Sequence, residues 1–438
     1  MMQKYDQLVK DLAPKKFGIK GTIWIAFLVI IILAALYAYY QQLTKGLIVT
    51  DMRDYALWGV YISNFVFFVA VSLIGSLISA VLTISKQKWS IPLTRIAEIV
   101  AIASIIMAGL TIIIDMGRPD RLWHIFVYGR AQSPIVWDVL VISTYLFISA
   151  LLIYYPLLPD FAILKKYYKD AGSKESKWYG KLSLNWTGSP KQKEILHKSI
   201  RTLAVLIIPV AFAVHTVTSW LFSTTYRPGW DSTNFGPYFV AGAFVAGTAA
   251  VIMITYVLRS THNLKEYLPD EIFDKLGKLL VLLCLIYIYF NINEYLIPAY
   301  KNTSEEKEHL YSLFFGNYAI LFWSVIFISF IFPVIVLIFP KGRKPLPMFF
   351  IGFIVLVGSW WKRYIIVTPT LLHPFLPIQD VDKAWHQYFP TVVEWTITFG
   401  TLASALLIIT ILVRYLPIVP IQETAEENNL IETAKKSE

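Results

Sequence analysis

Two aspartates flank a short loop in the first third of the chain. The stretch DMGRPDRLWHIFVYGRAQSPIVWDV begins at Asp115 and separates two long apolar runs. Pro119 should end the first run as a helix, and Pro134 should begin the second, with Asp138 in its first turn. Such a hairpin can bring both carboxylates to one depth in a membrane, with Arg118 near enough to pair with either of them.

This hairpin has two interpretations. In one, Arg118 and the aspartates form an interfacial salt bridge that holds two helices together. In the other, the carboxylates accept protons from a ligand that arrives within the membrane, as quinol oxidation requires, because each quinol loses two protons. Asp138 is then the principal acceptor, since helix-start N–H groups favour its charged form while desolvation opposes it. Asp115 is its partner, at a helix end where the dipole opposes a negative charge.

A single histidine lies deep in an apolar run. His215 begins HTVTSW and sits about a turn and a half inside the outward end of its run. It either hydrogen-bonds across helices or contacts a ligand carbonyl or hydroxyl. We expect Trp137 to lie in the same site. Four further residues are expected to line the pocket: Asp54, Tyr61, Asn64 and His124.

The sequence offers no evident electron carrier. Its one cysteine, Cys284, excludes a disulfide framework, a cysteine-ligated iron–sulfur cluster and a cysteine-based zinc site within this chain. A transmembrane haem held by two histidines needs a facing pair within the spans, and only His215 is clearly inside one. We therefore expect no haem and no metal in this chain. If it reacts with quinol, the electrons must leave to a partner protein.

Long apolar runs must position these residues. Hydrophobic residues make up 56% of the 438 residues and charged residues only 16%, with a mean hydropathy of +0.57. Runs of about twenty apolar residues cross a ~30 Å hydrocarbon layer as helices. We expect spans at residues 22–40, 57–84, 92–115, 135–157, 200–223, 237–259, 275–298, 317–339, 346–367 and 390–416. The fold class is therefore an all-α polytopic membrane protein with about ten transmembrane helices.

The net charge of +10 reflects membrane topology rather than nucleic-acid binding. Lys and Arg concentrate in the N-terminal segment, the even-numbered loops and the C-terminal segment, above all in the loop 158–199. The positive-inside rule then places both termini in the cytoplasm and the aspartate hairpin on the outward side. We expect a multi-pass protein of the cell membrane, surrounded by lipid.

Four motifs resemble the NrfD family of polysulfide reductase membrane subunits. They are GRPDRLWH from Gly117, SPIVWDV from Ser133, HTVTSW from His215 and RPGWDSTNFGPYFVAGAF from Arg227. The similarity covers residues 52 to about 415. The span layout looks most like the ten-span branch found in alternative complex III and related molybdopterin oxidoreductase complexes. Two positions depart from the complex III pattern: Asp115 stands where a histidine is frequent, and Leu221 where a carboxylate is frequent.

The resemblance implies two four-helix bundles flanked by the first and last spans. It implies a quinone site, for menaquinone or ubiquinone, in the first bundle, beneath an outward-facing iron–sulfur subunit. A molybdopterin-type or related subunit, and other membrane subunits, are the further partners it implies. The expected organisation has a first span with its flanks at 1–56, a first bundle with the quinone site at 57–223, a second bundle at 224–367, and a last span with an acidic cytoplasmic tail at 368–438.

The preferred function is a quinone-reactive membrane subunit of a respiratory oxidoreductase complex, and proton translocation is left open. A secondary transporter is the runner-up, and it would be supported by broken helices at the midplane. Here the breaks are expected at span ends. A structural membrane anchor is the third interpretation, in which the aspartates and the histidine only hold helices together.

Overall fold

Ten long helical segments make up most of the chain. The computed structural model describes residues 2–85, 89, 91–376 and 379–427, and it contains no strand within them. Nine segments are long and apolar enough to cross a membrane, and α3 carries a shorter apolar stretch, Val60–Gly75. The segments are α2 (Ile19–Lys45), α3 (Val60–Ser85), α4 (Ile91–Asp115), α6 (Pro134–Asp170), α8 (Pro190–Ser223), α9 (Phe235–Thr261), α10 (Asp270–Lys301), the composite Ala319–Ile338, α14 (Pro345–Leu371) and α15 (Val392–Tyr415). This confirms the all-α polytopic fold class and the count of about ten.

The composite segment is helical throughout but changes its winding. It consists of α12 (Ala319–Ser324), the π-helical η4 (Val325–Ile331) and α13 (Phe332–Ile338). A π-helical turn is an expected accommodation before Pro333, because proline has no N–H for the regular ladder.

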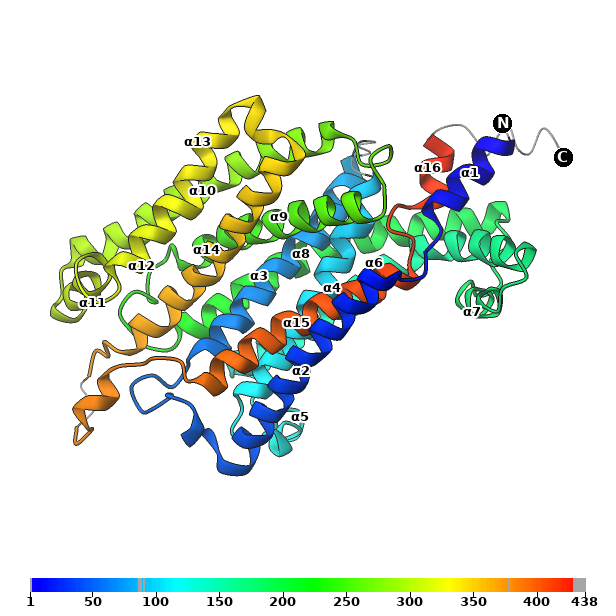
Figure 1. Ribbon diagram of the computed structural model, residues 1–438. Helices are drawn as coiled ribbons and strands as arrows, with labels where there is room; N and C mark the ends of the chain where they lie inside the picture. Colours follow the sequence, from blue (N-terminus) through cyan, green and yellow to red (C-terminus); the bar gives the residue numbers. More distant parts are fainter. Residues whose placement is uncertain (1, 86–88, 90, 377–378, 428–438) are drawn as a thin grey trace.

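The helix contacts form two bundles. Helices α3, α4, α6 and α8 pack on one another, and so do α9, α10, α14 and the composite segment Ala319–Ile338. Helix α9 joins the bundles, because it also packs on α3, α4 and α8. Helices α2 and α15 lie side by side, and α15 packs on α4 and α3 (Figure 1). At that pairing a Cβ on Gly400 would lie 2.1 Å from Ala35 Cβ, so a small residue is required there.

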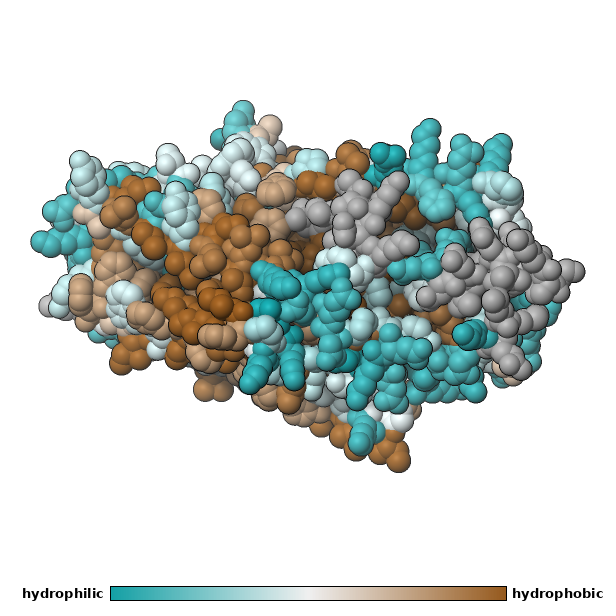
Figure 2. Space-filling model, turned by 90° about the horizontal axis from the view of Figure 1, so that it is seen from above, coloured by the Kyte–Doolittle hydropathy of each residue, from teal (hydrophilic) through white to brown (hydrophobic). Residues whose placement is uncertain are grey.

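Burial separates central from peripheral helices. Two-thirds of the most apolar window of α9 is buried within the chain, against 11% of that of α2. Hydrophobic residues form a broad area left of centre in Figure 2, and hydrophilic residues cover the far left edge and much of the right half of the view. This pattern is expected of a bundle with a lipid-facing belt and wetted ends.

The two ends of the molecule differ in their short helices. The first and last of the described helices, α1 (Met2–Leu12) and α16 (Ile421–Glu427), lie at one end, called here the terminal end, together with α7 (Glu175–Leu182) (Figure 1). The opposite, distal end carries α5 (His124–Tyr128) and α11 (Ser304–Phe314), along with the loop that contains the 3-10 turn Pro119–Arg121. The expected hairpin, formed by α4, the loop after it and α6, therefore has its loop at the distal end.

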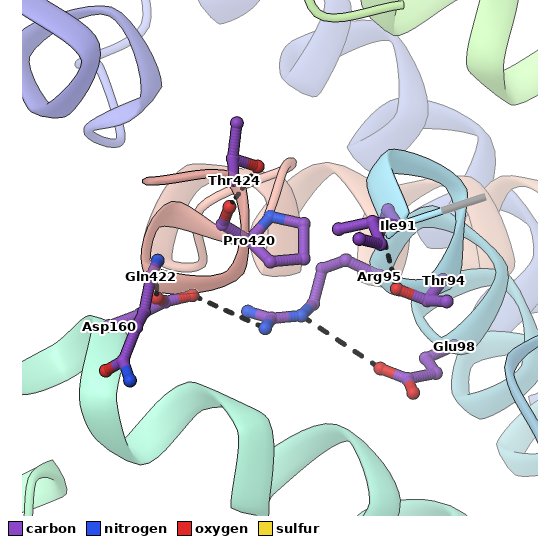
Figure 3. A network of polar contacts seen from close by, with 8 residues as sticks. All are labelled: Ile91, Thr94, Arg95, Glu98, Asp160, Pro420, Gln422 and Thr424. Atoms are coloured by element: carbon purple, nitrogen blue, oxygen red, sulfur yellow. Dashed lines mark hydrogen bonds and ion pairs between the residues drawn. The ribbon is translucent and has the colours of Figure 1, made fainter. Parts of the chain in front are cut away.

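A buried ionic group closes the terminal end of the first bundle. Arg95 of α4 and Asp160 of α6 are both 1% exposed, and their closest charged atoms are 3.4 Å apart. The backbone N–H of Gln422, at the start of α16, donates to Asp160 at 2.9 Å, and Arg95 also approaches Glu98 (Figure 3). The segment after the last span is thereby tied to the interior of the first bundle.

Candidate functional site

Asp138 forms the centre of the distal site. Helix α6 begins at Pro134 with Ser133 as its N-cap, as the sequence predicts. Asp138 is 2% exposed and accepts a 2.7 Å hydrogen bond from the hydroxyl of Thr218 on α8. Among the described residues no ion pair joins it to a cation, so this carboxylate is buried with a hydroxyl partner rather than a charged one.

His215 lies on the same face of α8, three residues before Thr218, and is 2% exposed. The carbonyl of Ala211 approaches its ring, but neither ring nitrogen reaches hydrogen-bond geometry with any described residue. Buried polar groups are normally hydrogen-bonded, so an imidazole without a protein partner calls for a water or a ligand.

Asp115 ends α4 as predicted, but it faces a different set of helices from Asp138. Its Oδ1 is buried without a hydrogen-bond partner among the described residues. Tyr61 of α3 lies within the electrostatic reach of both Asp115 and Glu394 of α15, and its hydroxyl donates to Gln42 of α2 at 2.8 Å. Among the described residues no hydrogen bond or ion pair joins Asp115 to Asp138. Asp138 lies with Thr218, whereas Asp115 lies with Tyr61 and Glu394.

Glu394 ties two distal loops together. It is fully buried and accepts hydrogen bonds from the backbone N–H groups of Asp51 and Thr391, each at 2.9 Å, and from the hydroxyl of Tyr388 at 2.6 Å. Together with Thr391 it forms a capping box at the start of α15. These bonds fix the wall against which Tyr61 and Asp115 lie.

The expected pairing of Arg118 with an aspartate of the hairpin is wrong. Arg118 is exposed, and its guanidinium bonds Asp120, two residues later, at 3.1 Å. That hydrogen bond lowers the pKa of the Asp120 carboxyl. The physical reason is proximity in water: Asp120 is held beside Arg118 by the turn at Pro119, whereas reaching either aspartate would require burying the guanidinium.

The structure divides the other predicted residues between a buried and a surface set. Tyr61 is buried, and so is Asn64, which bonds Trp360 at 2.7 Å and Thr398 at 3.0 Å. Trp137 is half-buried and its indole N–H donates to the carbonyl of Ala131, so it holds the loop before α6. The other two predicted residues lie at the surface: Asp54 is exposed, and His124 packs against Trp123 and Tyr128 within α5.

A second polar group, in the second bundle, was not anticipated from the sequence. Lys362 and Arg363 of α14 are 1% and 2% exposed, and Glu294 of α10 is 3% exposed. The Lys362 ammonium donates to the Tyr295 hydroxyl at 2.7 Å. The available signal was the pair of adjacent cations in WWKRY, inside an otherwise apolar run.

The order of these residues along the helices places both polar groups in the distal half of the molecule. His215 lies eight residues from the distal end of α8, and Arg363 eight residues from the distal end of α14. At 1.5 Å per residue both lie roughly 12 Å inside. Helix α9 packs on both α8 and α14, so it lies between the helices that hold His215 and Arg363.

Comparisons with known proteins agree with the motifs. The family model described as polysulphide reductase, NrfD, matches residues 48–374. The chain is 28% identical to a putative dimethyl sulfoxide reductase membrane subunit of Halobacterium salinarum, with 92% of each chain covered. It is 23% identical to the menaquinone reductase integral membrane subunit of Nitratidesulfovibrio vulgaris, again over 92% of each chain. It is 25% identical to the probable Ni/Fe-hydrogenase 2 b-type cytochrome subunit of Escherichia coli, over 85% of this chain and 86% of the relative. These relatives do not point to alternative complex III. With three-quarters of its length matched by the family model, the chain belongs to the NrfD family of polysulphide reductase membrane subunits.

Proposed function

We propose that this chain is the quinone-reactive membrane subunit of a multi-subunit respiratory oxidoreductase. The observation that carries the proposal is His215, whose buried imidazole has no hydrogen-bond partner among the described residues and lies one helical turn from the Asp138–Thr218 pair. The relative named as a menaquinone reductase subunit supports a quinone, and menaquinone is the first candidate.

The residues present fit a quinone headgroup. A quinone presents two carbonyl acceptors and a quinol two hydroxyl donors, and bound quinol supplies two electrons and two protons. The unpartnered imidazole of His215 can donate to a carbonyl or accept from a hydroxyl. Asp138 can accept a hydrogen bond and then a proton from a hydroxyl within reach. Thr218 holds the carboxylate in orientation, and the burial of all three excludes bulk water.

The electrons would pass to an outward-facing iron–sulfur subunit, itself coupled to a molybdopterin-type or related catalytic protein. The relative named as a membrane subunit of a dimethyl sulfoxide reductase supports such an assembly. The distal surface offers a docking area beside the start of α6, because Trp123, Phe126 and Tyr128 are more than half exposed there. Aromatic side chains of this kind are enriched at protein interfaces.

The proposed location is the cytoplasmic membrane, with both termini in the cytoplasm. Helices α1 and α16 share the terminal end with the Lys-rich α7 and its flanking loops (Figure 1). The positive-inside rule places that end in the cytoplasm and the distal site on the outward side.

The chain is proposed to bind no haem of its own, although its Escherichia coli relative is named a cytochrome subunit. Among the described histidines only His215 is buried deep in a span, and no group of three or more His, Cys, Asp or Glu side chains that could hold a metal occurs in the described ranges.

The test is to locate quinone in the purified complex. Organic extraction should recover a stoichiometric quinone, and a structure with a quinone-site inhibitor should place its headgroup within direct or one-water reach of Asp138 or His215. A headgroup bound between α9, α10 and α14, away from both residues, contradicts the assignment.

A further inference from the structure

We propose that the second bundle contains a proton relay that connects the quinone site to the distal surface through Lys362, Tyr295 and Glu294. This proposal rests on the proposed function, because the proton that the relay carries comes from quinol bound at His215. It assigns a role to a buried ionic group that lies outside the first bundle.

Burial of the ionic groups of the second bundle lowers the stability of the protein, so their presence there indicates a function. Lys362, Arg363 and Glu294 are each at least 97% buried. Within the described part of the chain no salt bridge of 4.0 Å or less joins any of them to an opposite charge. Burying a charge without a close ion pair is strongly unfavourable, because the charge loses its hydration. In membrane spans such residues usually mark ion or proton pathways.

Arg363 forms the junction between the two bundles. Its guanidinium lies 5.1 Å from the ring centre of Phe239, and its charge reaches both His215 and Tyr287. A Cβ on Gly242 would lie 2.8 Å from its Nη2, so this position on α9 keeps the space open. Its Nε and Nη1 have no hydrogen-bond partner among the described residues, and buried donors of this kind bind water. Arginine does not release its proton, so its part is to hold water between His215 and the next carrier.

The carriers follow in a short series. The Lys362 ammonium donates to the Tyr295 hydroxyl at 2.7 Å and lies over the ring of Tyr295. Glu294 precedes Tyr295 on α10. One of its oxygens accepts from Ser232 at 2.8 Å and from Asn234 at 2.9 Å, and the other, Oε1, is buried without a partner among the described residues. Each of these groups can release the proton that it holds and then take up another: Lys362 as a neutral amine, Tyr295 through its phenol oxygen and Glu294 as a carboxylate.

A small cavity continues the series toward the distal surface. It is lined by Glu294, Tyr295 and Tyr238 on its inner side and by His309 on its outer side. About 20 Å³ of it is available to water. Roughly 10–15 Å³ suffices for one molecule, provided that polar partners are present. His309 contacts the partly exposed His373 edge to face, with ring centres 5.6 Å apart. Water in this cavity would link Glu294 to the outside.

The protons of the reaction balance along this route. For each quinol oxidised, two electrons pass to the iron–sulfur partner and two protons pass to the chain. Asp138 accepts one and His215 the other. Glu294 releases a proton through the cavity, the Lys362 ammonium reprotonates it by way of Tyr295, and the resulting neutral amine takes the proton of His215 through water at Arg363. The proton of Asp138 then passes to His215 and leaves in the same way, so both groups are ready for the next quinol. Reduction of quinone would use the same groups in reverse.

The experiment compares single-group deletions with matched controls in the purified complex. Tyr295→Phe removes one hydroxyl, and Glu294→Gln removes the titratable carboxyl. The controls are Tyr289→Phe, a lipid-facing position 63% exposed on the same helix, and Glu271→Gln at its terminal end. Both relay variants should lower quinol turnover at least about tenfold with an unchanged KM for quinol, since proton-transfer groups contribute ~100-fold or more. Both controls should match the wild type.

A second readout needs no quinone. In infrared spectra of the quinone-free complex transferred to D₂O, the band of the protonated Glu294 carboxyl should exchange quickly both in the wild type and in Tyr295→Phe, because Glu294 reaches the outside through the cavity rather than through Tyr295. A band that stays unexchanged in the wild type would contradict this exit. The Glu294→Gln variant assigns the band by its loss. Should Glu294→Gln fail to assemble, Tyr295→Phe alone decides, because it changes one oxygen atom.

The outcomes separate the relay from the quinone site. Wild-type turnover with normal assembly in Tyr295→Phe overturns the relay. If Asp138→Asn is impaired at the same time, the quinone site stands and only the relay falls. If the wild-type complex neither binds nor turns over quinone, the proposed function itself falls.

Discussion

Thr218 of α8 donates a 2.7 Å hydrogen bond to Asp138 of α6, which joins two helices of the first bundle near their distal ends. Both residues are buried, so the bond is shielded from bulk water. The Thr218 hydroxyl therefore sets the orientation of the Asp138 carboxylate.

Replacing Thr218 by valine should weaken quinone turnover while leaving the fold largely intact. Valine has nearly the shape of threonine but leaves the carboxylate without its donor, and hydrogen bonds to charged groups contribute about 1.5–3 kcal/mol. Turnover by the purified complex should fall by about ten-fold or more. Thr218→Ser keeps the hydroxyl and should retain most activity. Equal rates for both variants would show that this bond has no part in the reaction.

Adding a methyl group at Gly242 should disturb the junction between the bundles. A Cβ there would lie 2.8 Å from both Arg363 Nη2 and the Tyr287 ring, and such overpacking costs roughly 1–3 kcal/mol. Gly242→Ala should lower the melting temperature of the complex and slow its turnover. Gly236→Ala on the same helix is the control, since its nearest neighbour would be at an ordinary 3.5 Å. A Gly242→Ala complex as stable as this control contradicts the close packing.

Breaking the ionic group at the terminal end should destabilise the complex strongly. Arg95→Met leaves the Asp160 carboxylate buried without its cation, and such losses cost about 3–5 kcal/mol. The double variant Arg95→Met/Asp160→Leu should recover part of the lost thermal stability, because neither charge then remains. Arg118→Gln, which removes an exposed ion pair, should leave the melting temperature unchanged. A double variant less stable than Arg95→Met would argue against this explanation.

The isolated protein should show no haem absorption band in oxidised or reduced spectra. His215 is the one described histidine buried deep in a span, so no facing pair of axial ligands is available among the described residues. A haem band that disappears in His215→Ala would overturn this prediction and would assign His215 as a ligand.

The sequence predicted well where a residue lies along its helix, but it predicted poorly which neighbouring helix that residue faces. Proline and the apolar run lengths indicated where α4 and α6 meet the distal loop, and both helices end or begin at the expected residues, Asp115 and Pro134. Which face of α4 carries Asp115, however, depends on how α2 and α15 pack beside it. Apolar residues cover all sides of a membrane helix, so periodicity does not reveal the neighbour.

The same limit explains the second bundle. Glu294 and Arg363 lie near the ends of apolar runs, but their burial with Lys362 arises because α9 and α10 pack on α14, which lies much later in the sequence. The loop residues failed for another reason. Arg118 pairs with Asp120, which is closer along the chain and also exposed, so its guanidinium stays hydrated and is not buried beside an aspartate of the hairpin.

The most direct measurement is quinone turnover by the assembled complex carrying Asp138→Asn. Asparagine keeps the size of the side chain and a hydrogen-bond acceptor for Thr218, but it cannot take a proton. Partner subunits should first be quantified, with Asp120→Asn, an exposed aspartate in the loop between α4 and α6, as the control. Turnover should fall about 100-fold in Asp138→Asn, Asp138→Glu should retain part of it, and Asp120→Asn should match the wild type. An Asp138→Asn complex that assembles normally and turns over quinone at the wild-type rate would contradict the account, because Asp138 would then only join α6 to α8.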